Sequence, residues 1–262
     1  DDWLAPNEAY PRGKEWATKA LQRDSTLAEA FTALGKVLGW YEWDFGGAVH
    51  QLEQAIELNS NYAEAHFTLG SVFPCLGRLD EALAEIRRAF ELDPLHGETG
   101  FWLARFLLYQ GDYVGSIQQS LKVLETHPQF YRAYIIMGHA HLQKGDPEAG
   151  LEQYRRAQAL EGSVPAYDAF IARGLAMTGK EEQARRILAG LVERASERYI
   201  RPEMLAVGYA ALGELDAAFA QLEQALKARS AGLIYLAVDP MYQPLRADPR
   251  FAELVKKVGL KV

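Results

Sequence analysis

Cysteine is almost absent from this chain of 262 residues, and Cys75 is the single one. One cysteine cannot form an intrachain disulfide, so no disulfide framework holds this fold. The sequence gives Cys75 no histidine and asparagine context for a catalytic thiol. We therefore interpret it as a small residue near the end of a helix.

Long apolar runs and a basic surplus are also missing. No stretch approaches 18 consecutive apolar residues, so we predict no membrane insertion. The net charge is −7, which argues against nucleic acid as a partner because phosphate binding requires a clustered basic surface. The given sequence starts at Asp1 rather than Met, and its first residues do not predict a secretory signal. We expect a segment cut from a longer protein, or a processed product, with a cytoplasmic location.

Patterns typical of catalytic or metal sites are missing too. His139 and His141 are two positions apart and would point to different faces of a helix. No cysteine or carboxylate completes a ligand set at helical spacing. The glycines are spread out rather than clustered into a phosphate-binding loop. The sequence therefore predicts no metal, no cofactor and no enzymatic activity.

The chain does contain glycines at a regular spacing. A glycine recurs every 34 residues, with helical patterning between the marks, at Gly77, Gly111, Gly145, Gly179 and Gly213. We expect a glycine such as Gly77 to end the first helix of its repeat, where a left-handed conformation costs little. The unit 63–96 shows the pattern best, with Leu69, Gly70 and Phe73 in a first helix and Ala82, Ile86, Ala89 and Pro94 in a second. This unit resembles the tetratricopeptide repeat (TPR) family. The resemblance implies an all-α fold, a right-handed α-solenoid of antiparallel helix pairs.

The repeat register divides the chain into three parts. Residues 1–27 are expected to be a leading partial repeat that supplies a second helix. Six repeats follow, at 28–62, 63–96, 97–130, 131–164, 165–198 and 199–232. Residues 233–262 are predicted to be a capping segment, since Asp239-Pro240 and Asp248-Pro249 are both typical of a helix start. We expect this segment to cover the last repeat.

Two passages resemble a narrower group of bacterial proteins. The turn at 40–45 and the tail at 233–254 are similar to TPR segments that follow a signalling module. Such modules include winged-helix regulators, nucleotide cyclases and Ser/Thr kinases. The resemblance implies a sensor or docking region of a larger bacterial signalling protein.

The family's concave groove is lined by the first helices of successive repeats, and the resemblance maps one set of residues onto it. Its arginines could hold carboxylates while apolar neighbours supply desolvated area. This combination suits a protein or peptide ligand with acidic groups. Two alternatives remain, a solvated groove without a specific ligand and a groove filled by another segment of the same protein. The mapped residues are Lys36, Phe67, Phe101, Arg105, Leu108, Arg132, Ile135, His139, Leu142 and Arg173.

The predicted function is therefore a non-catalytic scaffold that binds proteins or peptides. A rival interpretation is a self-association module that forms a homo-oligomer through the array ends or an edge. A small-molecule or enzymatic role would require a closed pocket with convergent polar groups. The sequence alone reveals no such pocket.

Overall fold

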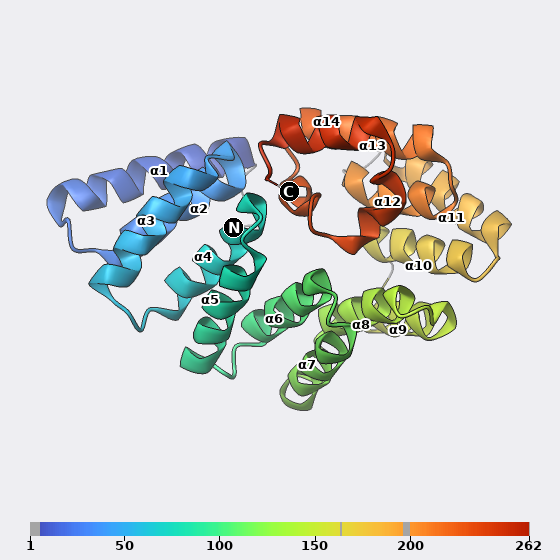
Figure 1. Ribbon diagram of the computed structural model, residues 1–262, viewed down its shortest axis with the longest axis horizontal. Coiled ribbons are helices and arrows are strands. Elements are labelled where there is room, and N and C mark those ends of the chain that lie inside the picture. Colours follow the sequence, from blue (N-terminus) through green and yellow to red (C-terminus); the bar gives the residue numbers. More distant parts are fainter. Residues whose placement is uncertain (1–5, 163, 196–199, 262) are drawn as a thin grey trace. The chain divides into compact units, whose positions relative to one another are not determined.

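Every regular element in the described part of the chain is a helix (Figure 1). The computed structural model describes residues 6–162, 164–195 and 200–261. The chain divides into two compact units, which we treat separately. Unit 1 comprises Asp1–Thr99 with Gly259–Val262, and unit 2 comprises Gly100–Val258.

Unit 1 is built from helices that pair through short loops. Helix α2 packs on α3, α4 packs on α5, and α1 lies against α2. A π-helix, η1, continues α2, and a 3-10 turn, η2, continues α4. The bounds are α1 Pro6–Arg23, α2 Ala28–Lys36, η1 Val37–Glu42, α3 Phe45–Leu58, α4 Ala63–Val72, η2 Phe73–Leu76 and α5 Leu79–Leu92.

The first repeat, 28–62, has 35 residues where the next repeats have 34, and the sequence predicts that the additional residue lengthens the turn at 40–45. In the structure, the helix instead runs on to Glu42 as η1, whose wider winding takes up one more residue. Trp43 then adopts a left-handed conformation with φ 60°. Asp44 begins α3, and its carboxylate accepts a hydrogen bond of 2.9 Å from the Gly47 N–H.

Unit 2 continues the same arrangement. Helix α8 packs on α9, α10 on α11, and α12 on α13. Helix α6 begins at the end of unit 1 and continues into unit 2. The bounds are α6 Gly97–Gln110, α7 Tyr113–Thr126, α8 Tyr131–Gln143, α9 Pro147–Glu161, α10 Pro165–Met177, α11 Glu181–Arg194, α12 Pro202–Ala211, α13 Leu215–Lys227, η3 Ala231–Tyr235, η4 Pro240–Leu245 and α14 Pro249–Val258.

The helices begin close to the repeat register. Helices α2, α4, α6, α8 and α10 start at the first residues of the proposed repeats. The expected start of the last repeat, residue 199, lies outside the described residues. The division into six repeats and a cap remains our proposal for the organisation of the chain.

The periodic glycines end the first helices, as predicted. They adopt positive φ angles of 72°, 86°, 81°, 75° and 73° at Gly77, Gly111, Gly145, Gly179 and Gly213. A residue with a Cβ atom is strained in this conformation, whereas glycine is not. Glycine therefore recurs at this position because each helix pair needs the same tight turn.

The contacts inside each helix pair recur with the same period. Gly70 approaches Ile86 so closely that an added Cβ would lie 2.7 Å from Ile86 Cγ1. The second helices contribute small, fully buried residues: Ala48, Ala82, Ser116, Ala184 and Ala218. Small side chains at the contact let the paired helices approach closely.

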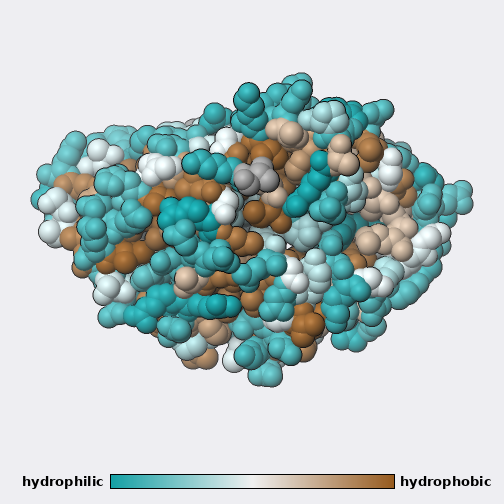
Figure 2. All heavy atoms as spheres, viewed as in Figure 1, coloured by the Kyte–Doolittle hydropathy of each residue, from teal (hydrophilic) through white to brown (hydrophobic). Residues whose placement is uncertain are grey.

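Hydrophilic residues cover most of the face seen in Figure 2.

The tail of the chain contains the two predicted helix starts. Asp239 precedes η4 and accepts a hydrogen bond of 2.9 Å from the Met241 N–H. Asp248 precedes α14 and accepts one of 3.0 Å from the Arg250 N–H. Helix α14 packs on α13 and η4 packs on α12. Both Asp-Pro pairs therefore begin helices, as predicted.

Candidate functional site

Unit 2 contains a half-open cavity of about 310 Å³. Its walls come from first helices α6, α8, α10 and α12 and from η4 of the tail. Several of the residues that the repeat register assigns to the groove therefore lie around this one cavity. The predicted site residues that line this cavity are Phe101, Arg105, Leu108, Arg132, Ile135 and His139.

Arg105 binds a carboxylate that belongs to the same chain. Its Nη2 lies 3.6 Å from Asp239 Oδ2, and its Nε donates to the Tyr109 hydroxyl. Tyr109 in turn donates a hydrogen bond of 3.0 Å to Asp239 Oδ2. Asp239 is 2% exposed, so these donors replace the hydrogen bonds to water that its carboxylate loses on burial. The acidic group that the sequence led us to expect from a partner is here supplied by the tail.

Aromatic packing holds the tail against α6. The Tyr235 ring centroid lies 5.5 Å from that of Trp102, 6.2 Å from that of Phe106 and 5.8 Å from that of Tyr109. The Arg105 guanidinium lies 5.2 Å from the Tyr235 ring centroid. Burial raises the pKa of the Tyr109 hydroxyl well above its usual value, so it stays protonated and can donate to Asp239.

A second buried network joins three helices of unit 2. The Tyr154 hydroxyl lies 2.6 Å from His139 Nδ1 and accepts a hydrogen bond of 3.2 Å from Arg173 Nη1. Burial, with the positive charges of Arg173 and Arg105, lowers the pKa of His139 well below its usual value. Burial also raises the pKa of Tyr154 to about 12. The network therefore consists of a neutral histidine, a neutral tyrosine and a charged arginine.

Two further arginines line the cavity. The Arg132 guanidinium lies 4.0 Å from the centroid of the Phe101 ring, a cation–π contact. Arg201 is exposed, and its Nε lies 3.8 Å from Glu203 Oε1. Glu203 is 1% exposed and accepts a hydrogen bond of 2.8 Å from the Ser230 hydroxyl, just before the tail. Three arginines thus contribute to the lining, and the carboxylates of Asp239 and Glu203 lie beside two of them.

The other four predicted site residues lie elsewhere. In unit 2, Leu142 is 3% exposed and Arg173 is 4% exposed, and neither lines the cavity. In unit 1, Phe67 is half-buried. Lys36 forms an ion pair with Glu64. The arginine that periodicity places in the groove at position 173 thus turns into the helix pair.

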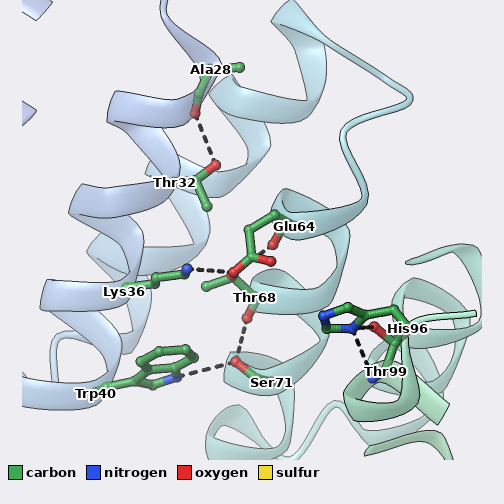
Figure 3. Close-up of polar contacts among 9 residues, drawn as sticks. All are labelled: Ala28, Thr32, Lys36, Trp40, Glu64, Thr68, Ser71, His96 and Thr99. Carbon is green, nitrogen blue, oxygen red and sulfur yellow. Dashed lines mark hydrogen bonds and ion pairs between the residues drawn. The ribbon is translucent and has the colours of Figure 1, made fainter. Parts of the chain in front are cut away.

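On the face of unit 1 that carries Lys36, most of the polar side chains drawn in Figure 3 bind groups of the same unit. The Trp40 indole N–H donates a hydrogen bond of 3.2 Å to the Ser71 hydroxyl. Ser71 in turn donates one of 2.6 Å to the Thr68 carbonyl. The Lys36 ammonium lies 5.8 Å from the Trp40 ring centroid. These polar groups bind one another, so this face offers fewer groups to a ligand than the cavity in unit 2.

Several cavity residues were absent from the sequence prediction. Asp239 and Met241 come from the tail, which sequence reasoning assigned to a cap. Tyr131 begins α8, Tyr167 lies in the first turn of α10, and the two rings pack edge-to-face with centroids 5.3 Å apart. Their place at the start of successive first helices was the available signal.

The described residues were also compared with the requirements of a metal site, a reactive thiol and a membrane span. They include no group of three or more histidine, cysteine or acidic residues that could hold a metal ion. Cys75 is fully buried, and burial raises the pKa of its thiol well above its usual value. Among the helices described, none combines the length and apolar character needed to cross a membrane.

Comparison with known families identifies the repeats. Residues 76–130 and 131–163 each match a model described as tetratricopeptide repeat. The stretch from 76 to 163 therefore consists of tetratricopeptide repeats. No curated protein matches the chain.

Solved structures share the fold. A tetratricopeptide repeat protein from Parabacteroides merdae is 14% identical, with a TM-score of 0.68 over 94% of this chain and 91% of that one. PilW, a type IV pilus biogenesis factor, is 17% identical, with a TM-score of 0.60 over 87% and 98%. YrrB, described as a TPR protein with an unusual peptide-binding site, is 17% identical, with a TM-score of 0.50 over 76% and 97%. The fold is thus an all-α tetratricopeptide repeat solenoid.

Proposed function

We propose that this chain is a non-catalytic scaffold whose unit 2 binds an acidic peptide of a partner protein along α6, α8 and α10. The observation that carries the proposal is the place of the chain's own acidic segment. Asp239 meets Arg105 and Tyr109 on this face, so the face already accommodates a carboxylate next to an aromatic residue. The arginines Arg132 and Arg201 extend the basic lining beyond the contact with Asp239.

The setting we propose is the sensor or docking region of a larger bacterial signalling protein. Support comes from the likeness of the turn at 40–45 and of the tail to segments that follow signalling modules. YrrB, which shares the fold, is itself described as having a peptide-binding site. Binding at this face would compete for space with the tail, and so could pass a signal along the chain.

The test is a peptide-display selection on the wild-type protein, followed by affinity measurements on Arg132→Glu. We expect the selected peptides to be rich in Asp and Glu, and Arg132→Glu to weaken them by about 10-fold or more, since it replaces a charge-assisted contact with repulsion. Arg155→Glu is the matched control, because Arg155 is exposed on α9 and lies outside the cavity. Peptides without acidic residues, or equal losses in both variants, would contradict the proposal.

Self-association is tested on the same variants by sedimentation velocity at several concentrations. A mass that rises with concentration, without selection of acidic peptides, would favour the oligomerisation module instead. Circular dichroism melting of each variant checks that the fold is retained.

A further inference from the structure

The cavity in unit 2, on the face proposed to bind a peptide, has the size of a site for one small molecule. Its volume of about 310 Å³ lies at the lower end of the range for small-molecule pockets. A helix is about 10 Å across and would not enter it. One ring-sized body would, against the apolar walls of Phe101, Tyr167 and Met204. The tail residues Asp239 and Met241 form part of the wall.

A buried histidine offers a hydrogen-bond donor to this cavity. His139 is 4% exposed and lines it. Its Nδ1 lies beside the Tyr154 hydroxyl, which already accepts from Arg173. Tyr154 is fully buried, and the acceptor available to its own proton among the described residues is His139 Nδ1. Because this tautomer satisfies Tyr154, the neutral ring carries its proton on Nε2.

No described residue accepts a hydrogen bond from His139 Nε2. The interactions of this ring in the described structure are its contact with Tyr154 through Nδ1 and its edge-to-face packing on Phe170, with centroids 4.7 Å apart. His139 Nε2 is not one of the buried side-chain atoms without a partner, and the residue lines the cavity. A ligand oxygen in the cavity could therefore replace water as the acceptor for this N–H.

The charge of the lining selects an anion. The lining contains three guanidinium groups, those of Arg105, Arg132 and Arg201, and one carboxylate, that of Asp239. The carboxylate of Glu203 lies beside Arg201, so the three positive charges still exceed the two negative ones. The Asp239 oxygens are occupied, because Oδ1 accepts from the Met241 N–H and Oδ2 from the Tyr109 hydroxyl. The cavity is thus positive, and the acid in its wall is already committed. Such a lining attracts a negatively charged group and repels a cation.

We propose that this cavity binds one small organic acid, a carboxylate carried on an aromatic or aliphatic body. The carboxylate accepts hydrogen bonds from His139 and the arginines, and the body packs against the aromatic wall. A neutral donor together with charged ones suits an oxygen anion whose remaining surface is apolar. This goes beyond the proposed peptide-binding function, since the ligand is a free small molecule.

The experiment is calorimetric titration of the whole chain at pH 7.5 with three probes. Hydrocinnamate supplies the acid on an aromatic body, and hydrocinnamide is its uncharged counterpart of the same shape. The blocked peptide acetyl-Ala-Phe-Glu-Ala-amide supplies a side-chain carboxylate. We expect saturable binding of hydrocinnamate at one site, and at least about 10-fold weaker binding of the amide.

Two variants locate the site. Arg132→Gln should weaken hydrocinnamate by about 10-fold, whereas Arg155→Gln, on the exposed face of α9, should leave its affinity unchanged. Nitrogen-15 NMR of the histidines adds a readout that does not depend on a variant, since the acid should shift the protonated Nε2 of His139.

The outcomes separate the two proposals. Equal affinity for acid and amide, no saturable binding, or equal losses in both variants would overturn the small-acid site. If the peptide binds and hydrocinnamate does not, the free-acid proposal fails while the peptide-binding function gains support. Binding of hydrocinnamate without binding of acidic peptides would support the small-acid site and count against the peptide function.

Discussion

Among single residues, Gly138 makes the closest contact with the buried network of unit 2. A Cβ atom at this position would lie 2.3 Å from Cε1 and 2.5 Å from Cδ1 of Tyr154, which is fully buried. Gly138→Ala should therefore displace the tyrosine ring, or move the two helices apart. We expect a loss of about 1–3 kcal/mol in the free energy of unfolding, measured by urea denaturation.

Gly190 provides the matched control, because it also lies inside a helix. Among the described residues, no atom other than the nearby backbone of its own helix lies within 4 Å of a Cβ built on it. Gly190→Ala should raise the free energy of unfolding by up to about 1 kcal/mol, through the better helix propensity of alanine. Similar effects in the two variants would show that propensity, and not the contact with Tyr154, decides the result.

The residue positions could be predicted from the sequence better than their side-chain directions. The 34-residue period predicted the turn glycines correctly, because each turn needs the same backbone conformation. It also placed His139 and Arg173 at one repeat position. The period does not determine where a long side chain runs, and both side chains turn inward to reach Tyr154. Their destination depends on that tyrosine, whose counterparts in other repeats include Ile86 and Leu188.

Among the elements, the part of the tail formed by η3 and η4 is held in place largely through one side chain, that of Asp239. Asp239 accepts hydrogen bonds through both oxygens, from the Met241 N–H and from Tyr109, and it also pairs with Arg105. Asp239→Asn keeps the shape but replaces one acceptor with a donor. The new N–H₂ would face Tyr109 and Arg105, or the helix cap would be lost. We expect a loss of about 2 kcal/mol in local stability.

Hydrogen exchange of residues 231–245 is the measurement for this variant. Faster exchange should be confined to the tail and α6, with the overall helicity kept. Asp216→Asn is the control, since Asp216 is 95% exposed and its ion pair with Arg250 is superficial. Unchanged exchange in Asp239→Asn would show that aromatic packing of Tyr235 alone holds the tail.

The location of this element could not be predicted from the sequence. Its helix starts were predicted because an Asp-Pro pair acts on the residues next to it. Its contact with α6 joins Tyr109 to Asp239 across 130 residues and belongs to no repeat. Asp239 could be read from the sequence, but no repeat position or short-range pattern links it to Arg105. Its place beside the arginine therefore could not be predicted.

In the chain as a whole, the two units should respond to acid in opposite directions. In unit 1, His66 Nδ1 lies 2.5 Å from Glu85 Oε2 and Nε2 lies 3.0 Å from the Ser60 carbonyl oxygen. Two acceptors favour the doubly protonated ring, and the hydrogen bond with Glu85 raises the pKa of His66. Its contribution to stability is present below the usual histidine pKa of about 6.5 and is lost as the pH rises through the folded value.

His139 in unit 2 has the reverse sign, since burial lowers its pKa. Below about pH 6.5 the unfolded chain takes up a proton that the folded site refuses, so acid destabilises unit 2 by up to about 1.4 kcal/mol per pH unit.

Neighbouring repeats can open separately, so hydrogen exchange at pH 7.5 and 5.5, corrected for intrinsic rates, can resolve the two units. We expect lower protection in α8 and α10 at pH 5.5, and higher protection in α4 and α5. His66→Phe should abolish the gain and leave the loss. A uniform change along the chain would mean that surface carboxylates, rather than these two histidines, control the response.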